Sequence, residues 1–331
     1  MAEVKGKKQN LWKKHRMAIL FLAPALLALF FLLLVPLLQA IWISLLDLNK
    51  STLDQFLSSP FIGMRNYIEV AFSKSSAVHQ GLWDAIRNTV IYTFFVIVGT
   101  VVFGLGGALL INRKFKGNAL ARSLIMLSWV VPSYVVGMWW GFMWQQEEGI
   151  INIFLFDIVH LDVWSSWFGV HWEYNQLGEL LKPRWLTGEN TIWAIIIPSI
   201  WRLWPFAMLL FYYALKSIPK EIYEAAEIDG STKIERFFHI TLPLLRPIIA
   251  LVVLYGVISN VYSFNIITMM FGNGAGLPGR YGDLILPNIF RNVFGVWDFG
   301  MGAAMSVLLM GAMAIFSLAW LHKFKEDLSN D

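Results

Sequence analysis

Six long apolar stretches alternate with polar segments along this chain of 331 residues. Each stretch holds at least about 20 residues, which is enough to cross a bilayer core of about 30 Å at 1.5 Å per helical residue. The pattern therefore predicts an all-α, polytopic membrane protein. The predicted spans are residues 17–46, 89–111, 123–144, 191–214, 248–271 and 301–321.

The first predicted span follows a basic tail, residues 1–16, which carries six Lys and Arg residues. Its apolar core is longer than that of a signal peptide and has no small-residue cleavage site, which favours an uncleaved anchor helix. Pro24 and Pro36 lie inside the span, so we expect it to be tilted or kinked.

Small residues predict one close helix–helix contact. Thr100, Gly104 and Ala108 lie four residues apart and therefore on one side of the second predicted span. This spacing allows helix backbones to approach closely in lipid. Ordinary packing within the chain is the simplest interpretation of it.

The distribution of Lys and Arg predicts the orientation of the chain in the membrane. One set of segments carries 17 of these residues and the other set carries eight. The positive-inside rule therefore places both termini and the first set in the cytoplasm of a bacterial or archaeal cell, with the protein in the cytoplasmic (inner) membrane. The first set is 1–16, 112–122, 215–247 and 322–331, and the second, external set is 47–88, 145–190 and 272–300.

The external loops are acidic and rich in tryptophan, and two interpretations of these side chains stay open. Tryptophan is typical of the membrane–water interface, where it anchors a protein, but it also suits contacts with an external partner. The residues in question are Trp164, Trp167, Trp172 and Trp185.

Composition excludes several classes of protein. Hydrophobic residues make up 57% of the chain and charged residues 15%, whereas soluble domains have about 25% charged residues. The net charge of +4 follows from the cytoplasmic loops, so no nucleic-acid surface is expected. The absence of cysteine excludes disulfides, and the six histidines show no metal-ligand spacing. No P-loop sequence and no catalytic cluster is present, so we expect neither an enzyme nor a cofactor.

The loop 215–247 is predicted to fold as two helices joined by a glycine turn. Pro219 suits the start of the first helix, and Gly230 suits its end because glycine readily adopts a positive φ. Thr232 followed by Glu235 forms a capping-box sequence that starts the second helix. An ordinary amphipathic connector remains an alternative interpretation of these signals.

The same loop resembles the EAA loop of permease subunits from binding-protein-dependent ABC importers, which have the type I (MetI-like) fold. The spacing is Glu-Ala-Ala, three residues, Gly, nine residues, Ile, one residue, Leu-Pro. In that family this loop is the coupling helix that fits a cleft on a cytosolic ATPase. The resemblance implies ATPase-coupling roles for Glu224, Ala225, Ala226, Asp229, Gly230, Ile240, Leu242 and Pro243.

The resemblance extends along the chain and is to the MalF-like carbohydrate branch of the family. The segment from Phe61 to Tyr67 resembles the F-x-G-x-x-N-Y motif, and Asn88-Thr89 opens the second span as in the family. One departure lies after the fifth span, where Asn265 replaces an aspartate common in that branch. A second is the segment 272–278, which replaces the common G-G-P sequence.

The resemblance also implies partners. These are a second, homologous permease subunit, a dimer of cytosolic ABC ATPases that binds ATP and Mg, and an extracytoplasmic solute-binding protein. Membrane lipid surrounds the spans.

Polar and aromatic residues inside two predicted spans are candidates for the substrate path. An arginine in the middle of a span is costly in lipid. Arg202 therefore faces the path, pairs with an acidic group of the partner permease, or is a packed, snorkelling side chain. Polar side chains of the fifth span either touch substrate or make helix–helix hydrogen bonds. The candidates are Trp201, Arg202, Trp204, Tyr255, Asn260, Tyr262 and Asn265.

We therefore predict the permease subunit of an ATP-driven importer for a carbohydrate, working by alternating access. An ABC permease for a non-sugar solute, such as a polyol or a glycerophosphodiester, is the alternative. A secondary carrier would be expected to show inverted repeats, which the sequence lacks, and a membrane-embedded enzyme would need a catalytic cluster.

Overall fold

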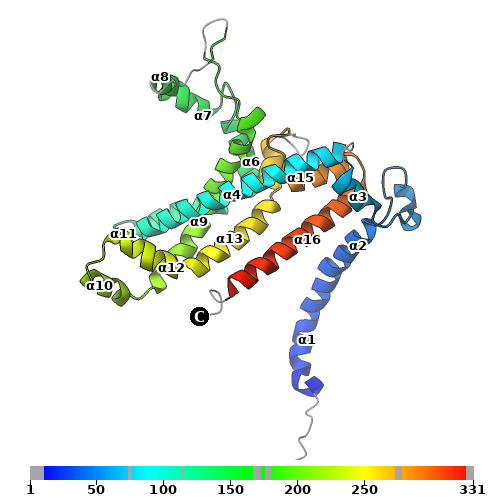
Figure 1. Ribbon diagram of the computed structural model, residues 1–331, viewed down its shortest axis with the longest axis horizontal. Coiled ribbons are helices and arrows are strands. Elements are labelled where there is room, and N and C mark those ends of the chain that lie inside the picture. Colours follow the sequence, from blue (N-terminus) through cyan, green and yellow to red (C-terminus); the bar gives the residue numbers. More distant parts are fainter. Residues whose placement is uncertain are drawn as a thin grey trace, which may run out of the picture. The chain divides into compact units, whose positions relative to one another are not determined.

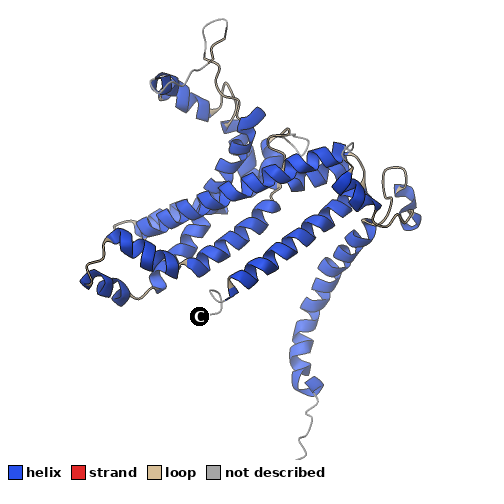
Figure 2. Ribbon diagram, in the orientation of Figure 1, coloured by secondary structure: helices blue, strands red, loops and turns tan. Residues whose placement is uncertain are grey.

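The structure is a computed structural model, and its described residues are 11–73, 77–113, 115–166, 173–175, 180–272 and 278–325. The regular structure of these residues is helical, and Figure 2 shows helices joined by loops. The predicted all-α class is thus confirmed. The chain divides into two compact units, which are residues up to 73 with 292–310, and residues 74–291 with 311 onward.

The first unit begins with one continuous helical stretch. It consists of α1 (Leu11–Leu29), a π-helical turn (Phe30–Leu34) and α2 (Val35–Ile43). The π-helical turn lies just before Pro36, whose ring removes a backbone N–H donor from the helix. Pro24, by contrast, lies inside α1 without interrupting it.

The segment that resembles the F-x-G-x-x-N-Y motif packs against the end of α2. Asn66, in α3 (Arg65–Phe72), donates from Nδ2 to the carbonyl oxygens of Ser44 and Leu46, at 2.9 and 3.0 Å. The hydroxyl of Tyr67 lies 2.5 Å from Ser44 Oγ. These motif residues therefore hold the chain as it leaves the first helical stretch. A 3-10 helix (Leu53–Ser58) lies between the two elements in sequence.

The last helix of the chain, α16 (Phe299–Lys323), begins in this first unit. Its Gly300 donates a backbone hydrogen bond to the Leu48 carbonyl at 2.9 Å. A Cβ at this position would lie 2.4 Å from the Leu46 carbonyl oxygen, so only glycine allows the approach.

The second unit is built on three helices that lie side by side (Figure 1), namely α4 (Ala77–Ile111), α9 (Thr191–Ser217) and α13 (Arg246–Val261). Small residues allow α4 and α9 to approach closely. A Cβ added at Gly104 would lie 2.9 Å from the Ala207 Cβ, and Ala108 is fully buried. The close contact predicted from the small-residue spacing of α4 is therefore present within the chain.

Two predicted spans are interrupted, which the sequence analysis did not foresee. The range 123–144 is not one helix but two, α5 (Asn118–Val130) and α6 (Ser133–Met143), which meet at an angle of 90°. Pro132 explains the break, because the residue before a proline avoids the helical region, and Val131 has an extended ψ of 128°.

The range 248–271 is likewise not continuous. Helix α13 ends at Val261, and the short helix α14 (Asn265–Met270) begins after a break at residues 262–264. At its other end, α13 is bent by 62° from the helical segment Lys233–Leu244.

Four described helical stretches are long and apolar enough to cross a membrane, and two bent pairs raise the number to six. The four are Ile19–Ile43, Gly81–Ile111, Gly188–Ser217 and Phe299–Lys323. The pairs are Asn118–Val130 with Ser133–Met143, and Lys233–Leu244 with Arg246–Val261. The upper number equals the six expected spans, but the second pair begins inside the loop 215–247 and not at residue 248. The side of the membrane on which each loop lies stays a prediction.

The segment 145–190 contains short helices and one well-packed tryptophan. The helices are α7 (Ile150–Asn152), a π-helical turn (Ile153–Ile158), α8 (Leu161–Ser166) and a 3-10 turn (Gly188–Asn190). Trp185 packs 4.8 Å from the Trp144 ring and donates to Asn152 Oδ1 at 2.7 Å, so it is held by contacts within the chain. Trp164 is exposed, whereas Trp167 and Trp172 lie outside the described residues.

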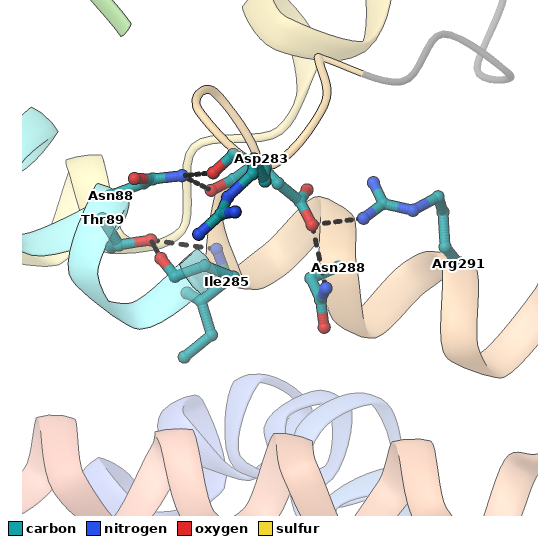
Figure 3. Close-up of polar contacts among 8 residues, drawn as sticks. Asn88, Thr89, Asp283, Ile285, Asn288 and Arg291 are labelled. Carbon is teal, nitrogen blue, oxygen red and sulfur yellow. Dashed lines mark hydrogen bonds and ion pairs between the residues drawn. The ribbon is translucent and has the colours of Figure 1, made fainter. Parts of the chain in front are cut away.

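Asn88 and Thr89 fasten a loop of the second unit to α4 (Figure 3). Asn88 Nδ2 donates to the carbonyl oxygens of Arg280 and Asp283, at 2.8 and 3.1 Å. Thr89 Oγ1 accepts from the backbone N–H of Ile285 at 2.9 Å. The Asn-Thr pair that resembles the family sequence thus has a structural role here.

The same loop is closed by a buried carboxylate, also visible in Figure 3. Asp283 Oδ2 accepts from Asn288 Nδ2 at 2.8 Å and forms an ion pair with Arg291. Asn288 belongs to α15 (Ile285–Phe290), and Arg291 opens a π-helical turn (Arg291–Gly295). Together these contacts fix the start of α15 beside α4.

The contact between α6 and α14 gives a test of the fold. A Cβ at Gly137 would lie 2.4 Å from the Ile266 carbonyl oxygen, so Gly137→Ala is expected to destabilise the protein by about 1–3 kcal/mol through overpacking. Thermal unfolding in detergent measures the effect. Gly106→Ala is the control, because nothing lies within 4 Å of that position and alanine favours a helix. Equal melting temperatures for the two variants would contradict the close packing.

Candidate functional site

A polar cavity lies where the interrupted helices meet α4 and α9. Its volume is about 140 Å³. It is lined by the start of α6, the start of α14 and the break between α13 and α14, and by residues of α4 and α9. Its polar side chains are Tyr92, Ser133, Ser199, Arg202, Ser259, Asn260, Tyr262, Ser263 and Asn265.

Hydrogen bonds join the helices around this cavity. The hydroxyl of Tyr92, a buried side chain of α4, lies 2.9 Å from Ser199 Oγ and 3.2 Å from Ser263 Oγ. Asn265 Nδ2 donates to Ser133 Oγ at 3.3 Å, which links the starts of α14 and α6. The lining is therefore a connected polar surface with contributions from four helices and the break after α13.

Two side chains of the cavity stand out by their contacts. Arg202 Nε lies 3.5 Å from the Val131 carbonyl oxygen, at the break between α5 and α6. Asn260 is only 2% exposed, and its Nδ2 has no hydrogen-bond partner among the described residues. A buried donor without a partner is costly, so Asn260 is suited to bind a polar group that enters the cavity.

The cavity contains four of the seven candidates for the substrate path, namely Arg202, Asn260, Tyr262 and Asn265. The other three lie elsewhere. Trp201 packs edge-on to Trp140, with ring centroids 6.0 Å apart. Trp204 packs against α4 beside Gly107, and Tyr255 lines a neighbouring apolar cavity.

The sequence analysis missed several residues of the cavity. Tyr92, Ser133 and Ser199 lie in other predicted spans than the fifth, and they were not singled out. The available signal was a hydroxyl group inside an apolar stretch, but many such hydroxyls bond to their own helix backbone. Ser199 Oγ does so as well, donating to the Ile195 carbonyl at 2.8 Å.

The loop 215–247, called the Glu224 loop from here on, folds as two helical segments around a glycine turn, as predicted. The first is α10 (Lys220–Ile228), and Gly230 follows it with a φ of +82°. The second consists of α11 (Lys233–Arg236), a π-helical turn (Phe237–Thr241) and α12 (Leu242–Leu244). The predicted capping box is confirmed: Glu235 N–H donates to Thr232 Oγ1 at 3.2 Å, and Thr232 N–H donates to Glu235 Oε2 at 2.7 Å.

Contacts between the two segments fix the shape of this loop. Arg236 Nη1 forms an ion pair with Glu227 Oε2 at 3.0 Å. The hydroxyl of Tyr223 lies 3.0 Å from Thr241 Oγ1. Because these contacts lie within the loop, its helices are held together without any other chain.

One face of α10 is exposed. Glu224 and Ala225 are exposed, and the Ile228 side chain is 87% exposed. Residues 224, 225 and 228 follow the i, i+1, i+4 spacing of a helix face. Of the other coupling candidates, Asp229, Gly230 and Pro243 are exposed, whereas Ala226, Ile240 and Leu242 are half-buried.

Comparison with known proteins decides the family. Residues 100–325 match the family described as the binding-protein-dependent transport system inner membrane component. The chain belongs to this family. The inner membrane component is a transport subunit and not an enzyme, which confirms the resemblance drawn from the sequence.

Relatives of this inner membrane component match it along nearly its whole length. The trehalose/maltose transport system permease protein MalF of Thermococcus litoralis is 28% identical over 319 residues, covering 96% of this chain and 97% of the relative. The inner membrane ABC transporter permease protein YcjO of Escherichia coli is 31% identical over 315 residues, covering 95% of each chain.

A solved structure confirms the type I fold. It is a chain of a bacterial alginate ABC transporter in complex with an alginate pentasaccharide-bound periplasmic protein, with a TM-score of 0.74. The match covers 98% of this chain and 99% of the other at 17% identity.

The capping box gives a prediction about pH. Hydrogen bonding to the Thr232 backbone N–H lowers the pKa of the Glu235 carboxyl below its ordinary value. Its stabilising effect is therefore present above about pH 4.3, the ordinary pKa of glutamate, and is lost as the pH falls through the lower pKa of the folded state. Hydrogen–deuterium exchange of the α11 amides, corrected for the intrinsic rate, is expected to show protection that falls over this range. Glu235→Gln should remove the pH dependence, and an identical response of both proteins would contradict the role of the carboxylate.

Proposed function

We propose that this inner membrane component is the permease subunit of an ATP-driven importer that takes up a carbohydrate delivered by an extracytoplasmic binding protein. The observation that carries the proposal is the polar cavity enclosed by the interrupted helices. Trehalose and maltose in the name of a relative that spans the whole chain support the choice of solute class.

The chemistry of the cavity suits a sugar. Hydroxyl groups of a carbohydrate accept and donate hydrogen bonds, and Asn260 and Asn265 offer both functions. The rings of Tyr262 and Phe264, which also line the cavity, offer apolar faces for C–H groups. A bound hydroxyl would give the unpartnered Nδ2 of Asn260 a hydrogen-bond acceptor and remove the cost of leaving this donor unsatisfied.

The size of the cavity supports alternating access. Its volume of about 140 Å³ is below the roughly 300–1,000 Å³ of pockets that hold small molecules. Solute entry therefore requires the surrounding helices to move apart. The interrupted pairs α5–α6 and α13–α14 offer breaks at which such movement can occur without unfolding a helix.

The partners in this proposal follow from the family resemblance and the charge distribution. Both termini and the Glu224 loop lie in the cytoplasm of a bacterium or archaeon. A dimer of ABC ATPases binds ATP and Mg there, so this chain itself holds no cofactor. A second, homologous permease completes the membrane part, and the binding protein docks on the loops 47–88, 145–190 and 272–300.

The exposed face of α10 is the proposed contact for the ATPase. Glu224 and Ile228 combine a carboxylate with an exposed apolar side chain, and Ala225 between them leaves low relief. The contacts Glu227–Arg236 and Tyr223–Thr241 make the loop stiff enough to transmit movement. The other coupling candidates form the turn after α10 and the segment that leads to α13. They are Asp229, Gly230, Ile240, Leu242 and Pro243.

Arg202 favours a second candidate solute class. A guanidinium in the cavity attracts an anion, such as a glycerophosphodiester, more strongly than a neutral sugar. A ligand screen of the cognate binding protein separates the two classes. Binding of acidic solutes alone would overturn the carbohydrate proposal and leave the importer proposal intact.

Charge reversal on α10 tests coupling. Glu224→Lys is expected to reduce uptake per ATP hydrolysed about tenfold or more, because the proposed partner groove would meet the wrong charge. Gly230→Leu should act similarly, since its φ of +82° strains any other residue. The measurement is solute uptake and ATP hydrolysis in the same proteoliposomes. Lys116→Glu, an exposed charge reversal in the loop 112–122, is the control, and wild-type coupling in Glu224→Lys would contradict the proposal.

Truncation of Asn260 tests the solute site. Asn260→Ala is expected to raise the KM for uptake about five- to tenfold, since a hydrogen bond contributes about 1 kcal/mol net. Coupling should stay unchanged, because Asn260 lies at the end of α13 that is farther from the loop containing α10. Ser128→Ala is the matched control, as its hydroxyl bonds only to the Ile125 carbonyl of its own helix. An unchanged KM in Asn260→Ala would exclude Asn260 from the solute site.

A further inference from the structure

A second cavity, of about 680 Å³, lies at the ends of α4 and α9 and beside the starts of α5 and α10. Four basic residues line it, namely Arg113, Arg122, Lys216 and Lys220. No acidic residue is among its described lining. The cavity is therefore a concentrated positive site within the second unit of the chain.

Two of the four cations of this basic cavity lie close to one aromatic ring. The Arg122 guanidinium carbon is 5.0 Å from the centroid of the Tyr212 ring, and Lys216 Nζ is 4.8 Å from it. Arg122 Nη1 also donates to the Tyr212 hydroxyl at 3.2 Å. None of the four basic side chains forms an ion pair with a described carboxylate. An anion that enters from outside the chain would reduce their mutual repulsion.

The remaining lining is apolar on one side. Ile111, Leu215 and Ile218 line the cavity together with Phe115. The cavity lies at the ends of two predicted spans, 89–111 and 191–214, on the side that the charge distribution predicts to be cytoplasmic. A site with cations at the level of the headgroups and apolar side chains beside them suits a phospholipid.

We propose that this basic cavity binds the phosphate of an anionic phospholipid from the cytoplasmic leaflet. Arg122 and Lys216 hold the phosphate, Arg113 and Lys220 complete the positive field, and the acyl chain lies along Phe115 and Ile218, which are more exposed than Ile111 and Leu215. The proposal rests on the membrane orientation given under the proposed function.

A lipid in this cavity links the Glu224 loop to the spans. Lys220 and Tyr223 line the cavity and belong to α10, whereas Arg122 and Lys216 belong to α5 and α9. A phosphate bound between them therefore holds α10 against the ends of these helices. Coupling between ATP hydrolysis and uptake should then require anionic lipid.

Native mass spectrometry of the whole transporter complex tests the site. The complex is reconstituted in nanodiscs of phosphatidylcholine and phosphatidylglycerol, extracted, and analysed for retained lipid. Wild type is expected to retain phosphatidylglycerol, and Arg122→Gln and Lys216→Gln are each expected to weaken retention about fivefold. Lys116→Gln removes a charge from the same loop outside the cavity and should retain lipid as wild type does.

A charge-conserving variant separates the effect of the lost charge from any effect of the substitution on folding. Lys216→Arg should retain phosphatidylglycerol, because the positive charge stays in place. Loss of lipid in Lys216→Arg, or equal retention in wild type and both glutamine variants, would overturn the proposal.

Free phosphate is the other source of this anion, and a second arm separates it from lipid. Lipid-stripped complex is melted in inorganic phosphate and in chloride at equal ionic strength. Stabilisation by phosphate together with no preference for phosphatidylglycerol would overturn the lipid source. Both nanodisc leaflets have the same composition, so retention does not depend on orientation or transport. A complex that retains lipid but transports no solute would contradict the proposed function alone.

Discussion

The requirement that every backbone polar group inside a membrane find a partner within the protein governs this structure. A continuous helix meets this requirement with its own hydrogen bonds, but two helical stretches are interrupted, at Val131–Pro132 and between α13 and α14. Breaks of this kind are tolerated only where they are buried in protein or line a polar space. Here the second break lines the polar cavity through residues 262–264, and the first lies beside the cavity, where the Val131 carbonyl oxygen is 3.5 Å from Arg202 Nε.

The close approach of α14 to α6 depends on the same breaks. Glycine at position 137 lets the backbone of Ile266 come near, and Asn265 reaches Ser133 at the start of α6. Arg202 therefore contacts the break and also lines the polar cavity, and its place in the substrate path stays a prediction. Its Nε donates to the Val131 carbonyl oxygen at the break, and its guanidinium places a positive charge at the cavity.

Local signals predicted local structure well. The capping box at Thr232 and the positive φ at Gly230 are each set by neighbours in the sequence, and the structure contains both. The small-residue spacing at Gly104 predicted a close contact without its partner, which is Ala207 of α9. The interrupted helices were missed because hydropathy averages over a window and does not distinguish a helix from a bent apolar chain. Pro132 was the available signal, but proline also occurs within intact helices, as at Pro24.

The hydrogen-bond partners of the motif residues could not be predicted from the sequence. Asn66 and Asn88 supported the family resemblance without any assigned role, because their partners are carbonyl groups distant in the sequence. Tyr92 and Ser199 were missed for the same reason, since 107 residues separate these two hydrogen-bonded side chains. Spacing within one helix cannot indicate such pairs. The polar cavity as a whole thus required the three-dimensional structure, although four of its residues were predicted singly.

Helix α9 contributes to both sites of the second unit. Ser199 and Arg202 line the polar cavity, and Lys216 lines the basic cavity beside α10. The whole helix is continuous over 27 residues despite Pro198 and Pro205, and it packs closely against α4 at Gly104. A displacement of α9 would therefore carry α4 with it, because the two helices pack closely together. The breaks beside the polar cavity are then the places where the α5–α6 and α13–α14 pairs can bend.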